Sequence, residues 1–220
     1  MPKHSSLYKK RMQIFIEEVN IYPVSCEDLA CGRTDIEWLD AVLAGGARIV
    51  QLRDKLSNDR TLLEKAKIFR QKTREANALF IVNNRVDVAL LSDADGVHLG
   101  NTDIPAQDVR KLAPDIIIGV SANTEEQAAS AESRGASYFN IGPLFPTKTK
   151  SGLSTFIGSE AIPVYAERSV LPFTVMGGIK LQHVDLLKSL GARRIAVVTA
   201  LCQADNITDE TKKWINALEK

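Results

Sequence analysis

Several apolar runs in this chain end in polar and charged residues that could perform chemistry together. One run leads into "QLRDK" (51–55), another into "NNR" (83–85), and a third into "HLGNTD" (98–103). Later runs lead into "SANT" (121–124) and into the long, helix-averse loop "GPLFPTKTKSG" (142–152). If the apolar runs are the parallel strands of a barrel, these segments share one end and form a single site.

The cations in these segments indicate an anionic ligand. Arg53, Lys55 and Lys150 would meet at the same end, and the hydroxyl groups of Thr147 and Thr149 would add hydrogen-bond donors. A single lysine is usually a solvated surface residue, but the net charge of +1 gives no general reason for such a cluster. A diphosphate is the kind of ligand that this set of donors would bind.

A second phosphate site is predicted near the end of the chain. "MGGIK" (176–180) and "VVTA" (197–200) would follow the last two strands, whose loops form the phosphate site of many barrels. The backbone amides at Gly178, Val198 and Thr199 could donate to a phosphate. The alternative, that Gly177 and Gly178 only form a tight turn, remains open.

Asp103 is the acidic residue best placed to bind a metal ion, although an aspartate before Ile-Pro fits a helix N-cap equally well. Mg²⁺ is usually held by one or two carboxylates together with phosphate oxygens. His98 ends an apolar run, which favours a buried supporting histidine over a general base. No nucleophile is paired with a base in the sequence, so the site is expected to bind phosphorylated groups and stabilise charge.

The elements that must position these residues form a repeating pattern. Helix-like segments end at Gly-Ala before apolar runs in "AGGARIVQL" (44–52), "SRGASYFNI" (133–141) and "SLGARRIAVV" (189–198). Thr34 with Glu37, and Thr124 with Gln127, fit capping boxes. Eight strands are predicted, at residues 21–24, 48–52, 78–82, 96–99, 116–120, 138–141, 172–176 and 194–198.

Eight strand–helix units predict an α/β protein with a single (β/α)₈ TIM barrel. An open doubly wound sheet would need a G-x-G-x-x-G motif after the first strand, and "YPVSCEDLACG" (22–32) has none. We expect residues 1–19 to be a helical extension, with a helix over 5–19 that covers one end of a barrel formed by residues 20–220.

The distribution of apolar residues and cysteines along the sequence excludes several classes of protein. The first twenty residues lack the apolar stretch of a signal peptide, and no run approaches the ~18 apolar residues of a membrane span. Cys26, Cys31 and Cys202 are too few and too scattered for a zinc site, so reduced thiols are expected. These features predict a cytoplasmic protein that binds neither nucleic acid nor membrane, and they leave homo-oligomer formation open.

The motifs resemble those of the superfamily of thiamine phosphate synthase and thiazole tautomerase. "QLRDK", "ADGVHLGNTD", "GVSANT", "GPLFPTKTK", "MGGI" and "IAVVTA" occur in the order and at about the spacing of that superfamily, over roughly residues 20 to 202. The resemblance implies a Mg²⁺-dependent transferase of thiamine biosynthesis. Such an enzyme joins hydroxymethylpyrimidine diphosphate to thiazole phosphate, through a pyrimidine carbocation, and releases pyrophosphate.

The resemblance also implies a role for individual positions. The pyrophosphate would be held by Arg53, Lys55, Asn83 and Lys150. The pyrimidine and its diphosphate would be placed by Gln51 and Ser121. The thiazole phosphate would be held by Thr147, Thr149 and the amides at Gly178, Val198 and Thr199. Asp103 and Asn84 would lie at the metal. The catalytic contribution would come from Arg53, Lys55, Lys150 and Ser121.

Three positions depart from the family pattern. The family has Asn-Asp after the third strand, with the aspartate as second metal ligand, whereas this chain has Asn83-Asn84; Asp87 is not expected to replace it. The usual Gln-Glu-Asp is Asn-Thr-Asp at 101–103. Asn123 stands where the tautomerase uses a histidine for proton transfer, which counts against a tautomerase.

Two alternatives to a synthase follow from these departures. The first is a synthase-like sensor or carrier that binds thiazole phosphate or thiamine phosphate without efficient turnover, because of Asn84. The second is a barrel isomerase for phosphorylated substrates, although the acid–base pair that it would need is not evident in the sequence.

Overall fold

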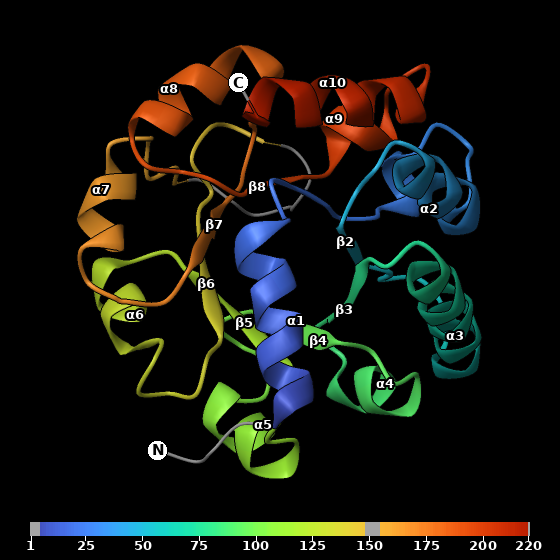
Figure 1. Cartoon of the computed structure of the whole chain (residues 1–220), viewed down its shortest axis with the longest axis horizontal. Coiled ribbons are helices and arrows are strands. Elements are labelled where there is room, and N and C mark those ends of the chain that lie inside the picture. Colours follow the sequence, from blue (N-terminus) through green and yellow to red (C-terminus); the bar gives the residue numbers. More distant parts are fainter. Residues whose placement is uncertain (1–4, 148–154, 220) are drawn as a thin grey trace.

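A single parallel sheet forms the centre of the molecule. The computed structural model describes residues 5–147 and 155–219. The strand order is β1-β8-β7-β6-β5-β4-β3-β2, and Figure 1 shows the strands inside a ring of helices. The strands are β1 (Ile21–Pro23), β2 (Ile49–Leu52), β3 (Leu79–Asn83), β4 (Gly96–Leu99), β5 (Ile117–Ala122), β6 (Tyr138–Ile141), β7 (Phe173–Val175) and β8 (Ile195–Val197).

The two edges of this sheet meet, so that the strands form a barrel. β1 pairs with β8 along its length, with Ile21 opposite Ile195. Val24, which follows β1, bridges to Gln51 in β2. The N–H group of Ser25 also donates to the carbonyl of Gln51 at 2.9 Å. All eight strands therefore present their carboxyl ends at the same end of the barrel.

Helices connect the strands and cover the outside of the barrel (Figure 1). They are α1 (Ser6–Glu17), α2 (Asp35–Ala44), α3 (Asp59–Glu75), α4 (Val86–Leu91), α5 (Ala106–Leu112), α6 (Glu125–Ser130), α7 (Ala161–Ala166), α8 (Val184–Ser189), α9 (Thr199–Cys202) and α10 (Ile207–Glu219), with two short 3₁₀ helices, η1 (Glu27–Leu29) and η2 (Leu181–His183). Both predicted capping boxes are formed, at Thr34 and at Thr124.

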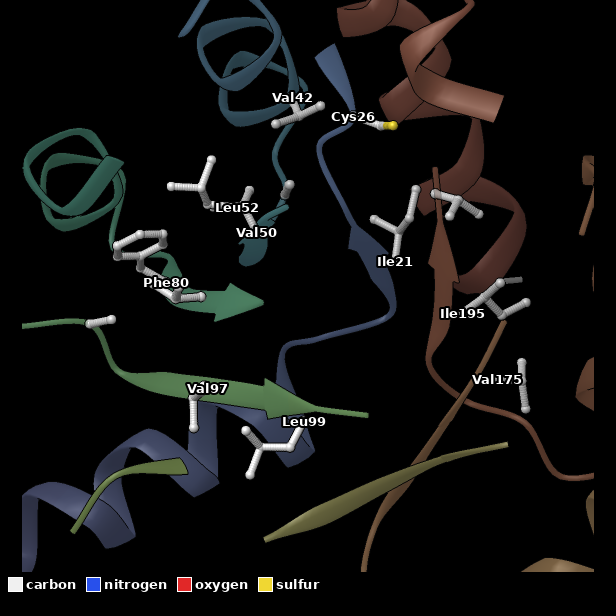
Figure 2. Close-up of a cluster of buried hydrophobic side chains, with 14 of the residues drawn as sticks. Ile21, Cys26, Val42, Val50, Leu52, Phe80, Val97, Leu99, Val175 and Ile195 are labelled. Carbon is white, nitrogen blue, oxygen red and sulfur yellow. The ribbon is translucent and has the colours of Figure 1, made fainter. Parts of the chain in front are cut away.

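Alternate residues of each strand belong to two different cores. Val50, Phe80 and Val97 face outward and pack in the layer between strands and helices, as Figure 2 shows. Ile49 and Ile81 belong to a smaller cluster inside the barrel. Because successive side chains of a strand point to opposite faces, strands covered on both faces become nearly continuous apolar runs. This is why the runs were visible in the sequence.

Helix α1 covers the amino end of the barrel, and in Figure 1 it crosses the centre of the view. Phe15 is fully buried, and its ring lies 4.6 Å from that of Tyr138. Arg194, directly before β8, donates to the carbonyls of Phe15 and Ile16 at 2.8 and 2.5 Å. These bonds satisfy carbonyl groups that the end of a helix leaves without partners. The opposite, carboxyl end is therefore the one available for a site.

The fold prediction is confirmed, and the predicted strands differ from the observed ones by two residues or fewer at each end. The helix expected over 5–19 is α1, while the domain boundary at residue 19 stays a prediction. The short helix α9 was not predicted, because four residues give no periodic pattern. None of the helices in the described ranges is long and apolar enough to span a membrane.

Lys65 of α3 holds together three segments beside the carboxyl end of β2. Its ammonium group lies 2.8 Å from Glu27, 2.7 Å from Asp35 and 2.6 Å from Asp54. Burial lowers the pKa of Lys65, but the hydrogen bonds that its ammonium group donates to these carboxylates outweigh burial and raise the pKa above its ordinary value. Asp35 and Asp54 are almost fully buried, so they depend on this one cation for charge compensation.

Replacing Lys65 with Met should therefore be strongly destabilising. Removing one partner of a buried ion pair costs roughly 3–5 kcal/mol, because it leaves uncompensated buried charge. The control is Lys72→Met, since Lys72 pairs with Asp40 on the surface and such pairs contribute about 1 kcal/mol or less. Urea unfolding at pH 7 measures both, and equal losses in the two variants would contradict a structural role for Lys65.

Candidate active site

A cavity of about 600 Å³ opens at the carboxyl end of the barrel. Every strand contributes to its wall, through Tyr22, Gln51, Asn83, His98, Ser121, Asn140, Thr174 and Ala196. A volume of this size is typical of sites for small organic ligands. The polar residues predicted from the strand ends therefore do share one space.

The loop after β2 directs its two cations toward this cavity. Arg53 and Lys55 line the cavity, whereas Asp54 between them does not. Asp54 instead accepts from Lys65 at 2.6 Å and from the N–H group of Ser57 at 2.9 Å. Asp54 is thus anchored away from the cavity, while Arg53 and Lys55 on either side of it stand on the cavity wall.

Asp103 lies on the cavity wall with both carboxylate oxygens already hydrogen-bonded. Oδ1 accepts from the side-chain amide of Asn84 at 3.0 Å, and Oδ2 accepts from the N–H group of Gly100 at 2.6 Å. Asn84 has a φ of 63°, in the left-handed region that asparagine tolerates better than most residues. Asn84 and Asp103, the two residues predicted at the metal, thus contact each other, and their role in metal binding stays a prediction. Asp87 is bound to Arg85 and does not line the cavity.

The loops after β6 and β7 pack tightly against each other. Gly178 has a φ of 62°, and a Cβ atom there would lie 2.4 Å from the carbonyl oxygen of Pro146. The N–H groups of Leu144 and Phe145 donate to the carbonyls of Met176 and Gly177 at 2.9 and 3.0 Å. The close contact between these two loops is therefore the primary reason for the glycine pair. Gly178 still lines the cavity, as the phosphate-site prediction requires.

Asn123, at the position of the tautomerase histidine, joins three loops. Its side-chain amide donates to the carbonyl of Gly142, and its Oδ1 accepts from Asn101 at 2.6 Å. Its N–H group donates to Gln127 at 2.7 Å. The oxygen and the nitrogen of this side-chain amide are both hydrogen-bonded to neighbouring loops. Asn123 therefore connects the loops, and an amide does not transfer protons as a histidine would.

A row of side chains connected by hydrogen bonds crosses the inner end of the cavity. It consists of Asn83, Gln51, Tyr22, Tyr138, His98 and Ser121, joined in that order at 2.9, 2.9, 2.9, 3.0 and 3.2 Å. Tyr138 is fully buried beneath the cavity. Room for its ring comes from Gly119, where a Cβ atom would lie 2.2 Å from the Tyr138 ring.

Comparison with known proteins gives the family of this architecture. A family model described as thiamine monophosphate synthase matches residues 21–201. Thiamine-phosphate synthase of Pelotomaculum thermopropionicum is 40% identical over 191 residues, covering 86% of this chain and 88% of that protein. The Clostridioides difficile enzyme of the same name is 38% identical over 197 residues, covering 89% of this chain and 93% of its own.

The chain belongs to the thiamine monophosphate synthase family.

Solved structures agree with this membership. Thiamine phosphate pyrophosphorylase from Pyrococcus furiosus superposes with a TM-score of 0.84 at 35% identity, covering 91% of this chain and 96% of that one. A 3-hexulose-6-phosphate synthase superposes with a TM-score of 0.65 at 16% identity, a likeness of fold alone. The family membership confirms the resemblance, the transferase class and the predicted activity, which is the synthesis of thiamine phosphate from two small-molecule substrates.

The structure brings most of the predicted site residues of this synthase-family chain to one cavity. Its wall includes Gln51, Arg53, Lys55, Asn83, Asn84, Asp103, Ser121, Thr147, Gly178, Val198 and Thr199. Thr149 and Lys150 lie outside the described residues. Sequence reasoning missed Tyr22, Tyr138, Asn140 and Thr174. Their signal was weak, because each is a single residue inside an apolar run whose inward face is known only once the barrel is closed.

His98 is an uncharged member of the row that crosses the cavity. Burial alone lowers the pKa of its imidazole to about 4. Its Nδ1 lies 3.0 Å from the hydroxyl of Tyr138, and its Nε2 lies 3.2 Å from Oγ of Ser121. A histidine that is neutral at pH 7 and held at both nitrogens fits a supporting role better than that of a general base.

The low pKa of His98 predicts a loss of stability in mild acid. The unfolded chain takes up a proton at this residue below about pH 6.5, whereas the folded chain does so only near pH 4. Stability should therefore fall as the pH decreases through this window, by about 3 kcal/mol. Urea unfolding at pH 4.5 and pH 7, for the native chain and His98→Gln, isolates this contribution. The same pH dependence in both would show that His98 titrates normally.

Proposed function

We propose that this cavity binds the pyrimidine diphosphate and the thiazole phosphate side by side and transfers the pyrimidine methylene group to the thiazole nitrogen. The bond between the methylene carbon and the diphosphate oxygen breaks, and its electron pair leaves with the diphosphate. The thiazole nitrogen then donates its lone pair to the resulting carbocation. The observation that carries this proposal is that one cavity gathers cationic side chains and the last two strand-end loops on its wall.

Arg53 and Lys55, with Asn83, are proposed to bind the diphosphate and stabilise the negative charge that develops on it as it leaves. Charge that is stabilised more in the transition state than in the bound substrate lowers the barrier. The anchoring of Asp54 by Lys65 supports this role, because it holds the cations in place before the substrate arrives. Lys150, outside the described residues, is proposed as a further cation at the same group.

The thiazole phosphate is proposed to bind at the opposite side, to the amides of Gly178, Val198 and Thr199 and to the hydroxyls of Thr147 and Thr149. Thr199 is the first residue of α9, and the first N–H groups of a helix have no partners within it. Gln51 and Ser121 would place the pyrimidine between the two phosphate sites. No cysteine lines the cavity among the described residues, which agrees with a reaction that needs no covalent intermediate with the protein.

Mg²⁺ fits this donor set only if the substrate supplies most of its ligands. The described residues contain no group of three or more acidic, histidine or cysteine side chains that could hold a metal ion. Asp103 would supply the anionic oxygen, and Asn84 would rotate its amide to offer Oδ1 in place of Nδ2. Bound in this way, Mg²⁺ would neutralise charge on the leaving diphosphate.

The proposed role of Arg53 is tested by measuring thiamine phosphate formation from both substrates with Mg²⁺. Arg53→Ala should lower kcat/KM by about 10²-fold or more, because one preorganised donor to a developing anion has that effect. Arg74→Ala is the control, since Arg74 pairs with Asp93 on the surface and should leave the rate unchanged. A native protein that binds both phosphates without making product would favour the sensor or carrier over the enzyme.

Asn84 gives a second prediction, on the magnesium requirement. Asn84→Asp adds the negative charge that a hard divalent cation prefers, so the Mg²⁺ concentration for half-maximal rate should fall by about tenfold, the equivalent of 1.4 kcal/mol. Asn216→Asp adds the same charge on the exposed face of α10 and serves as control. Asp103→Ala should abolish turnover and leave binding of thiazole phosphate nearly unchanged. Overlapping magnesium titrations for the native chain and Asn84→Asp would exclude position 84 from the metal site.

A further inference from the structure

In the row of hydrogen bonds beneath the cavity, each group can be assigned as donor or acceptor, and all the bonds point the same way along the row. At one end, the side-chain amide of Asn83 donates to Oε1 of Gln51, and Nε2 of Gln51 donates to the hydroxyl of Tyr22. An amide nitrogen cannot accept a hydrogen bond, so the Tyr22 oxygen is the acceptor in that contact. The proton of Tyr22 must then be donated to another group.

The next acceptor along the row is the hydroxyl of Tyr138, 2.9 Å from that of Tyr22. Both phenols are almost completely buried, and burial raises the pKa of each above its ordinary value, so both keep their protons. If Tyr22 donates to Tyr138, the single proton of Tyr138 goes to Nδ1 of His98 at 3.0 Å. Each hydroxyl then donates once and accepts once.

This direction determines which nitrogen of His98 carries the proton. A neutral imidazole has one N–H donor and one bare acceptor nitrogen. Because Nδ1 accepts from Tyr138, the proton is on Nε2, and Nε2 donates to Oγ of Ser121 at 3.2 Å. The hydroxyl proton of Ser121 is then not used within the row. Ser121 lines the cavity, so that proton is available to a bound molecule.

The opposite tautomer would conflict with the rest of the row. With a proton on Nδ1, Tyr138 would have to accept from His98 and donate to Tyr22. The Tyr22 hydroxyl would then receive two hydrogen bonds, from Tyr138 and Gln51, and its own proton would have no acceptor in the row. Tyr22 also lines the cavity, but it is only 1% exposed whereas Ser121 is partly exposed, so leaving the proton of Tyr22 without a protein partner carries the larger desolvation cost. This cost is avoided only if the side-chain amides of both Gln51 and Asn83 are flipped, so that their oxygen and nitrogen atoms exchange places.

We propose that Tyr138 and His98 are positioning residues that fix the hydroxyl of Ser121 as a hydrogen-bond donor toward the substrate. Neither residue needs to exchange a proton in the reaction for this role. The substrate atom that faces Ser121 must then be an acceptor, either a ring nitrogen or a diphosphate oxygen. The consequence for catalysis rests on the proposed function of the cavity, whereas the direction of the row does not.

The direction is tested by nitrogen NMR of the chain labelled at its three histidines, with His98→Gln to identify the signals of His98. In the native protein, at pH 7 and without ligand, Nδ1 should be bare and Nε2 protonated. Tyr138→Phe removes the donor to Nδ1 and should give a mixture of tautomers. The matched control is Tyr22→Phe, which keeps the Tyr138 hydroxyl and should retain the native tautomer.

The consequence for catalysis is tested by a double-mutant cycle between Tyr138 and Ser121. Tyr138→Phe should lower kcat about tenfold with KM within about twofold, because an interaction made mainly in the transition state is lost. In the Ser121→Ala background it should have no further effect, since the group that it positions is absent. A purely structural loss would instead lower the activity of both backgrounds by the same factor.

The outcomes separate the two claims. A proton on Nδ1 of His98 in the native protein would overturn the proposal, whether or not the variants fold. Multiplicative effects in the cycle would overturn the positioning role while leaving the tautomer in place. A native protein with the Nε2–H tautomer and no synthesis of thiamine phosphate would refute the function of the cavity but not the direction of the row.

Discussion

Every polar group inside a narrow parallel barrel must find a partner there, and this constraint shapes the molecule from the barrel floor to the cavity. The lower interior avoids the problem, because Ile49, Ile81 and Ile117 carry no polar atoms. Phe15 closes that layer from below and stacks on Tyr138. Tyr138 is therefore the transition between the layers, with its ring in the apolar layer and its hydroxyl in the polar one. The functional residues form the upper layer because only there do solvent and ligand supply partners.

The loops above this layer are held by contacts with one another and with the surrounding helices. Lys65 fixes the loop after β2 through Asp54, and Asn123 ties together the loops after β4, β5 and β6. The loops after β6 and β7 interlock at Gly178. In the loop after β2 the anchor is Asp54, which stands between the cavity-lining Arg53 and Lys55 and does not itself line the cavity. Such preorganisation is what a reaction driven by charge stabilisation requires.

Sequence reasoning could predict the barrel because two physical signals coincide in it. Strands covered on both faces read as apolar runs, and glycine ends the preceding helices, so both edges of "GARRIAVV" (191–198) are marked. Most of the cavity residues were found because they stand at the ends of the runs or directly after them. Tyr22 and Tyr138 could not be found by this rule, because they lie inside the runs. What sets them apart is that their side chains face the barrel interior, and the sequence does not show this. The loop contact at Gly178 joins residues far apart in the chain, which no local pattern contains.

Asn84 shows how a site can change its charge without changing its shape. The backbone there adopts a left-handed conformation, and asparagine and aspartate are the ordinary residues that tolerate it best. Either residue is therefore compatible with the backbone conformation of the loop after β3. The carboxylate of Asp103 must still be compensated, and the amide of Asn84 does so by donating to it. An aspartate at this position would instead repel Asp103 until a cation arrived. The backbone conformation at this position thus suits either residue, and the difference between the two lies in which partner Asp103 has.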